Sequence, residues 1–192
     1  MSDTNTPDRI LSIARDLLAA EGLSGLSFDA IARKLGRTKQ AVLYWYPSKR
    51  GLLAAMYLPA LQAEADAVAS ALAGQTGRDP AIAAFVRAVA AFHLSDLDRF
   101  RLMYLVPQTT RGKAADWGDG GLVDQVHPVT DALYGALADR LGAGGRAEAV
   151  AIHSAVLGLV LMHGLAASVQ DPLKHPPDVL IDALIASLTG PR

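Results

Sequence analysis

Residues 27–46 of this 192-residue chain read Ser-Phe-Asp-Ala-Ile-Ala-Arg-Lys-Leu-Gly-Arg-Thr-Lys-Gln-Ala-Val-Leu-Tyr-Trp-Tyr. Ser27 is a typical N-cap before an amphipathic run, Gly36 is a typical helix end, and Thr38 precedes a second short run. Two short helices joined by a tight turn that contains glycine have the layout of a helix-turn-helix. The stretch therefore predicts a DNA-reading element whose second helix enters the major groove.

The second helix of this element has two different faces. Val42 and Tyr46 are four residues apart, so they can pack together toward the Leu17 and Ile31 side of the preceding helices. The opposite face carries Lys39, Gln40, Leu43 and Tyr44. Lysine can donate to guanine O6 and N7, and glutamine can pair with adenine N6 and N7. Periodicity alone leaves a simpler interpretation open, in which these polar side chains only solvate an exposed helix.

The charge of the chain is distributed unevenly. The net charge is −1, which by itself argues weakly against nucleic acid as a partner. Residues 1–56, however, contain eight basic and five acidic residues, a balance of +3, whereas the remainder has a balance of −4. This asymmetry indicates that the N-terminal part faces DNA.

Composition excludes several classes of protein. The chain contains no cysteine, so it has neither disulfides nor thiolate metal sites. Residues 1–8 are polar and slightly acidic, unlike a secretory signal, and we expect a cytoplasmic protein. The apolar run at 155–169 is shorter than the ~20 residues that span a bilayer, so we expect a buried helix and no membrane partner.

Nearly every segment between glycine and proline residues shows helical periodicity, which predicts an all-α fold. Ser48 is expected to cap a helix that Pro59 breaks or kinks, dividing the chain into residues 1–57 and 58–192. The other expected helices are 7–21, 28–35, one between Thr38 and Pro47, 80–93, 96–105, 122–141, 146–169 and 178–188. Residues 108–121 are the one long loop signal.

The stretch 36–53, Gly-Arg-Thr-Lys-Gln-Ala-Val-Leu-Tyr-Trp-Tyr-Pro-Ser-Lys-Arg-Gly-Leu-Leu, resembles the DNA-binding signature of TetR-type transcriptional repressors. The shared features are a glycine with Ser or Thr two residues later, an aromatic cluster, a Pro-Ser-Lys and a leucine pair. The similarity extends without a gap over about residues 9–55. It implies a three-helix DNA-binding domain followed by a larger helical domain that binds an effector and dimerises.

The resemblance and the pattern together assign the DNA contacts. The chain departs from the family where a phosphate-binding tyrosine is frequent, since Leu43 stands there and is followed by two aromatic residues. Tyr46 replaces a phenylalanine that the family usually buries, so its hydroxyl needs a partner or water. The predicted DNA-binding residues are Ser27, Arg37, Thr38, Lys39, Gln40, Leu43, Tyr44, Trp45 and Lys49.

The C-terminal two-thirds is similar to the family in architecture alone. The resemblance implies a dimer seam between helices 122–141 and 146–169, with Val150, Ser154, Leu157, Gly158, Leu161 and Leu165 on one face. An ordinary core is the alternative interpretation. The candidate effector pocket, which can equally be ordinary core, comprises Phe85, Phe92, His93, Phe100, Met103, Tyr104, Trp117, His127, Thr130, Tyr134 and His163.

No pattern indicates catalysis. The five histidines lack the i, i+4 spacing of a helical metal site, and no H-E-x-x-H occurs, so neither a metal nor a cofactor is expected. No G-x-S-x-G elbow accompanies Ser154 beside His153. The expected partners are double-stranded DNA with a near-palindromic operator, a second copy of the chain and an unidentified small molecule. Two alternatives stay open: an all-α enzyme or carrier, and a DNA-bending protein without sequence preference.

Overall fold

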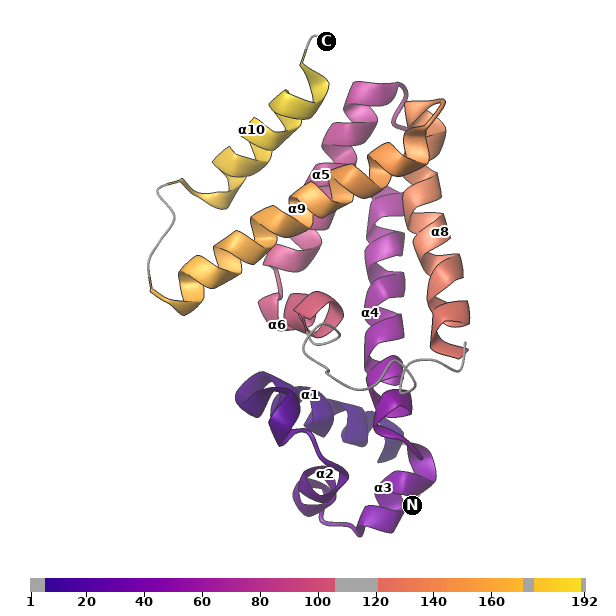
Figure 1. The fold of residues 1–192 in the computed structure, drawn as a ribbon, viewed down its shortest axis with the longest axis vertical. Coiled ribbons are helices and arrows are strands. Elements are labelled where there is room, and N and C mark those ends of the chain that lie inside the picture. Colours follow the sequence, from indigo (N-terminus) through magenta and orange to yellow (C-terminus); the bar gives the residue numbers. More distant parts are fainter. Residues whose placement is uncertain (1–5, 106–120, 171–174, 191–192) are drawn as a thin grey trace. The chain divides into compact units, whose positions relative to one another are not determined.

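The computed structural model describes residues 6–105, 121–170 and 175–190, and within these ranges the chain is helical without strands. The all-α prediction is therefore confirmed. The helices follow one another as shown in Figure 1. The expected loop at 108–121, including Trp117, lies almost entirely outside the described residues.

The chain packs as two compact units. Unit 1 comprises residues 1–60 and 98–126, and unit 2 comprises residues 61–97 and 127–192. The first division lies close to the predicted boundary at residue 57, but unit 1 also takes in a later segment. The assignment of residues 58–192 to one effector-binding and dimerisation domain stays a prediction.

The first three helices of unit 1 enclose a small core. Helix α1 spans Thr6–Gly25, although Gly22 has a left-handed φ of 66° that interrupts the helical geometry at the residue expected to end it. Helix α2 spans Phe28–Leu35, and α3 spans Lys39–Trp45. Their buried apolar side chains form one cluster with neighbouring residues of the chain, and its members include Ile10, Ala14, Leu17, Leu26, Ile31, Leu35, Val42, Leu52 and Met56.

The ends of α2 and α3 follow from their capping residues. The Ser27 hydroxyl oxygen accepts a hydrogen bond from the Ala30 amide at 3.1 Å, and the Thr38 hydroxyl oxygen accepts one from the Ala41 amide at 3.3 Å. Gly36 ends α2 in the left-handed conformation at φ 69°, which costs a residue without Cβ little. These caps hold the turn that sets the two helices against each other.

Helix α4 runs from Lys49 to Leu72 and passes through Pro59, so the expected break at this proline is wrong. Proline removes one backbone hydrogen bond and crowds the preceding turn. The exposed ring lies between turns anchored by buried side chains, with Met56 before it and Leu61 after it. Burial on both sides outweighs the local cost, and the helix continues.

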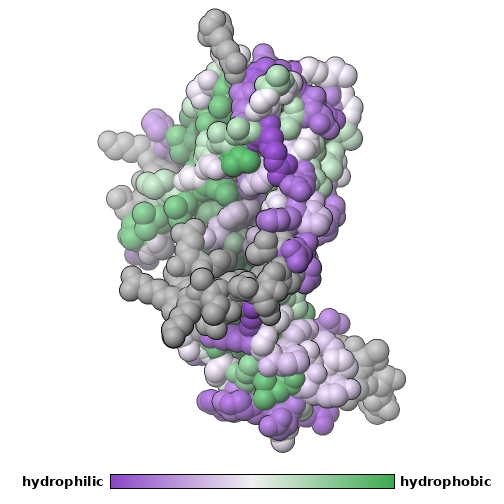
Figure 2. Space-filling model, turned by 45° about the vertical axis from the view of Figure 1, so that its right-hand side comes forward, coloured by the Kyte–Doolittle hydropathy of each residue, from purple (hydrophilic) through white to green (hydrophobic). Residues whose placement is uncertain are grey.

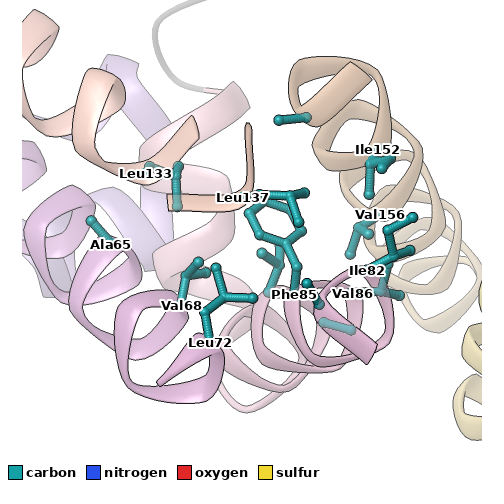
Figure 3. Close-up of a cluster of buried hydrophobic side chains, with 14 of the residues drawn as sticks. Ala65, Val68, Leu72, Ile82, Phe85, Val86, Leu133, Leu137, Ile152 and Val156 are labelled. Carbon is teal, nitrogen blue, oxygen red and sulfur yellow. The ribbon is translucent and has the colours of Figure 1, made fainter. Parts of the chain in front are cut away.

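Unit 2 is built from the second half of α4 together with α5 (Arg78–Leu94), α8 (Gly121–Leu141), α9 (Gly145–Ser168) and α10 (Pro177–Thr189). Their buried side chains converge on Phe85 of α5, whose ring lies among residues of α4, α8 and α9 (Figure 3). Leu137 and Phe85 are both fully buried there. This core packs α4, α5, α8 and α9 together, and each of these four helices also contributes one residue to a polar cluster described below.

The segment after α5 differs from the single helix expected at 96–105. Leu97–Phe100 forms the short helix α6, and Arg101–Leu105 follows as a π-helical turn. Leu102 is buried with the core cluster of unit 1. The wider turn therefore belongs to the packing of that unit.

Helix α9 has the expected length but is less buried than the sequence suggested. By length and composition it could cross a membrane, as could α5 taken together with the bent segment Leu97–Leu105, but core helices pass the same test. Only 33% of the most apolar window of α9 is buried within the chain. The expectation of a buried helix is thus confirmed for one face, which includes Ile152 and Val156, and wrong for the face that is exposed.

Candidate functional site

Helix α3 exposes one face and buries the other. Val42 is fully buried in the cluster that holds Leu17 and Ile31, and Tyr46 packs against the same cluster. On the other side Lys39, Gln40 and Tyr44 are exposed, and the exposed fraction of Tyr44 is 78%. This division of the helix is the one that its periodicity predicts.

The flanking residues of the predicted interface are also on the surface. Ser27, Arg37, Thr38, Trp45 and Lys49 are exposed, and Leu43 is half-buried. The hydroxyls of Ser27 and Thr38 accept cap hydrogen bonds while their own hydrogens can donate to a phosphate oxygen. All nine predicted contact residues are therefore accessible in unit 1 in some degree.

The two aromatic residues at the end of α3 contact each other. The ring centroids of Tyr44 and Trp45 are 5.2 Å apart at an interplanar angle of 87°, an edge-to-face arrangement. Both side chains are exposed, so both remain candidates for the DNA backbone contact. The third aromatic residue, Tyr46, is half-buried. Its burial and, to a smaller extent, the charge of Asp8 raise the pKa of its hydroxyl.

Lys39 has an intramolecular partner. Its Nζ lies 2.8 Å from Oδ2 of Asp29, and both side chains are largely exposed. The two residues line a hollow beside the starts of α2 and α4, together with Leu26, Ser27, Phe28, Lys49 and Leu52. Two lysines and two helix N-termini beside one hollow suit a phosphate group, whereas Asp29 opposes it.

Unit 2 contains a buried polar cluster that the sequence did not reveal as such. Glu64 of α4, His93 of α5 and His153 of α9 are at most 2% exposed. Oε1 of Glu64 lies 3.0 Å from Nε2 of His93 and 2.8 Å from Nε2 of His153. Nδ1 of His153 lies 3.1 Å from the hydroxyl of Tyr134 on α8. Four helices thus meet at one network.

The carboxyl group at the centre of this cluster is ionised. Burial alone would raise the pKa of Glu64, but hydrogen bonds and Coulombic attraction from His153 and His93 outweigh it and lower the pKa to about 2. Burial and the nearby Glu64 charge raise the pKa of the Tyr134 hydroxyl. The cluster therefore favours a carboxylate that is hydrogen-bonded to two imidazoles.

Two comparisons with known proteins bear on this geometry. Residues 10–56 match the family described as "Bacterial regulatory proteins, tetR family", and residues 82–188 match "Tetracyclin repressor-like, C-terminal domain". The chain belongs to the TetR family. A search of curated proteins found no significant match.

Solved structures share the fold of this TetR-family regulator. The regulatory protein SCO4313 superposes with a TM-score of 0.77 at 20% identity, covering 98% of this chain and 97% of that one. FadR from Bacillus subtilis in complex with stearoyl-CoA superposes with a TM-score of 0.72 at 11% identity, covering 96% of this chain and 99% of that one. PfmR from Thermus thermophilus superposes with a TM-score of 0.61 at 20% identity, covering 93% of this chain and 95% of that one. At these identities the likeness concerns the fold alone.

The residues predicted to line an effector pocket fall into both units of the TetR-family chain. In unit 2, Phe85 and His93 are buried, Phe92, Thr130, Tyr134 and His163 are half-buried, and His127 is exposed. In unit 1, Phe100 and Met103 are buried, and the rings of Phe100 and Tyr104 are 5.5 Å apart. Trp117 lies outside the described residues. The effector pocket stays a prediction.

The predicted dimer face is on the surface of α9. Val150, Ser154, Gly158, Leu161 and Leu165 are exposed and Leu157 is half-buried. Figure 2 shows that hydrophobic surface is exposed on unit 2. The large exposed apolar side chains described in this unit are on α9, at its end or on α10: Val150, Leu161, Met162, Leu165, Val169 and Val179. By contrast, the exposed residues of α8 are mostly polar, such as Asp124, Gln125 and Asp131.

Glu64 and His153 were not among the residues predicted from the sequence, although each lies where a signal was available. Leu61, Ala65, Val68 and Leu72 form the buried stripe of α4, and Glu64 lies on that stripe. An acidic residue at a core position is rarely buried without a partner. His153 likewise lies between the buried Ile152 and Val156. A polar residue within an apolar stripe was the available clue.

Proposed function

We propose that this TetR-family protein is a sequence-specific repressor that a small, mostly apolar ligand releases from its operator. The observation that carries the proposal is the exposed face of α3, which presents Lys39 and Gln40 directly after the capping hydroxyl of Thr38. Major-groove recognition requires side chains that read the bases together with groups that donate hydrogen bonds to phosphates.

The Lys39–Asp29 ion pair refines the proposed readout. In the free protein the ammonium group is held at the start of α2, 2.8 Å from a carboxylate. A guanine O6/N7 edge or a phosphate must compete with Asp29 for it. Because exposed pairs of this kind contribute little to stability, the exchange is inexpensive and DNA can recruit the lysine.

Replacement of the reading residues should change which bases are preferred. We expect Lys39→Ala and Gln40→Ala each to cost about 1–3 kcal/mol of operator binding at particular base pairs, and Lys49→Ala to weaken all sequences similarly. Competition binding on operator variants measures both effects.

Asp29→Asn is the matched control for this experiment, because it frees Lys39 without removing it. This variant should keep the base preference. An unchanged preference in Lys39→Ala and Gln40→Ala would mean that these residues do not read bases.

A second copy of the chain is the proposed partner of the α9 surface. An apolar stripe of this kind is suited to another apolar surface. Exposed apolar residues favour α9 with α10 as the interface helices, in place of the pair 122–141 and 146–169 expected from the sequence. A two-fold dimer would hold two α3 helices about one DNA turn apart, ~34–36 Å, and match a near-palindromic operator.

Release by a ligand requires that the ligand binds the DNA-incompetent state more tightly, since equal affinity for both states shifts nothing. The fold is shared with FadR, which was solved with stearoyl-CoA. Together with the aromatic residues of the predicted pocket, this supports an apolar effector. A cytoplasmic location follows from the proposed role at an operator.

Selection of bound sequences from random DNA tests the whole proposal. We expect a near-palindromic consensus, and release of that DNA when a panel including long-chain acyl-CoA esters is added. Binding without sequence preference would indicate a DNA-bending protein instead. Turnover or binding of a panel compound with no effect on DNA would indicate an enzyme or carrier.

A further inference from the structure

We propose that Glu64, His93 and His153 form a binding site for one divalent transition-metal ion of the zinc class. The three donor atoms lie within 4.8 Å of one another and come from three different helices. Two imidazole nitrogens and one carboxylate oxygen are a donor set that binds zinc, with a fourth position left for water or another ligand.

Two of the three donor spacings in the cluster, those from Glu64 to each imidazole, are close to those that a metal needs. In tetrahedral coordination with bonds of about 2.0–2.1 Å, neighbouring donor atoms are about 3.3 Å apart. The Oε1–Nε2 distances are now 3.0 Å and 2.8 Å. Small side-chain shifts, of about half an ångström or less, bring the Glu64–imidazole spacings into the range for coordination.

Tyr134 supplies His153 with the kind of outer partner that metal-bound histidines usually have. With His153 neutral and no metal bound, Nε2–H donates to the Glu64 carboxylate, and Nδ1 accepts from the Tyr134 hydroxyl. With metal on Nε2, the proton resides on Nδ1 and is donated to the same hydroxyl oxygen. A tyrosine hydroxyl can both donate and accept, so one contact at 3.1 Å serves either tautomer.

The surroundings also fit an ordered site. The Phe85 and Phe92 rings lie edge-on to His153 and His93, with centroids 6.0 Å and 5.1 Å apart. This aromatic packing restricts the orientations of the two imidazole rings. We expected no metal from the sequence because no two histidines have the spacing of a metal site within one helix. The three ligands proposed here come from separate helices, which that criterion does not cover.

Metal titration of the full-length protein tests this inference without any effector, although His93 and Tyr134 also belong to the predicted effector pocket. Chelator-treated protein without an affinity tag is titrated with Zn²⁺ and with Co²⁺. We expect one ion per chain, a visible Co²⁺ absorption typical of tetrahedral coordination, and a higher melting temperature with Zn²⁺.

Variants separate this site from adventitious binding. Glu64→Gln keeps the size of the side chain and should weaken binding by more than ~100-fold, since loss of an outer partner alone costs 10–100-fold. Tyr134→Phe should weaken it by about 10-fold while retaining the ligands. His175→Gln, at an exposed histidine that belongs to none of the sites described above, is the matched control and should bind as the parent does.

Two results would overturn the proposal. The first is parent protein that binds neither ion stoichiometrically. The second is stoichiometric binding that Glu64→Gln and Tyr134→Phe leave unchanged, which would place the ion elsewhere. Circular dichroism of each variant establishes that it is folded, and Tyr134→Phe keeps the test decisive if Glu64→Gln does not fold.

Discussion

Leu161→Glu should convert the protein into monomers and reduce operator affinity by about 100-fold or more, because two half-sites are then no longer bound through one linked molecule. Leu161 is 41% exposed on α9, so a charge there costs the single chain little. In an interface with a second copy the same carboxylate would be buried without a partner, which is strongly unfavourable. Sedimentation and operator binding measure the two effects.

Two further variants identify the second helix of the interface. Val179→Glu places the same charge on α10, and Ala132→Glu places it on the exposed face of α8. We expect Val179→Glu to dissociate the dimer and Ala132→Glu to leave it intact. The reverse pattern would restore the helix pair 122–141 and 146–169, and a fully dimeric Leu161→Glu would remove this residue from the interface.

Phe85→Ala should lower the free energy of unfolding by about 3–5 kcal/mol, which is a large part of the 5–15 kcal/mol typical of a domain. Phe85 is fully buried where α4, α5, α8 and α9 meet, and truncation leaves a cavity that these helices cannot close without moving (Figure 3). Chemical denaturation of the purified variant measures the loss.

Phe92→Ala is the comparison for this prediction. Phe92 is half-buried on the same helix, so its removal should cost clearly less. Phe85 was also a candidate for the effector pocket, and this experiment distinguishes a role in core packing from a role in lining that pocket. A loss below ~1 kcal/mol for Phe85→Ala would mean that its ring faces a space able to receive a ligand rather than a packed core.

Local sequence signals predicted the helix ends of the N-terminal DNA-binding part well, because those ends depend on nearby residues. Ser27, Gly36 and Thr38 act through hydrogen bonds and backbone angles within a few positions of themselves, so α2 and α3 begin and end where expected. Pro59 was misjudged for the opposite reason. Its local preference was outweighed by burial of Met56 and Leu61, which only the tertiary structure reveals.

Unit 2 was predicted less completely, since its important contacts join distant parts of the chain. Glu64 and His153 are 89 positions apart, and nothing in the sequence near either residue indicates that they meet. The Lys39–Asp29 pair likewise depends on the turn between α2 and α3. Helical periodicity identifies the face that each residue occupies, but not the residue opposite.

The exposed stripe of α9 has a consequence for how the protein responds to its own abundance. A dimer held by that stripe obeys mass action, so its share of the chains, and its apparent melting temperature, rise with concentration. Where monomers predominate, dimer concentration varies with the square of the amount of protein synthesised. Operator occupancy would then change steeply over a narrow range of expression, so that a modest fall in synthesis suffices to vacate the DNA.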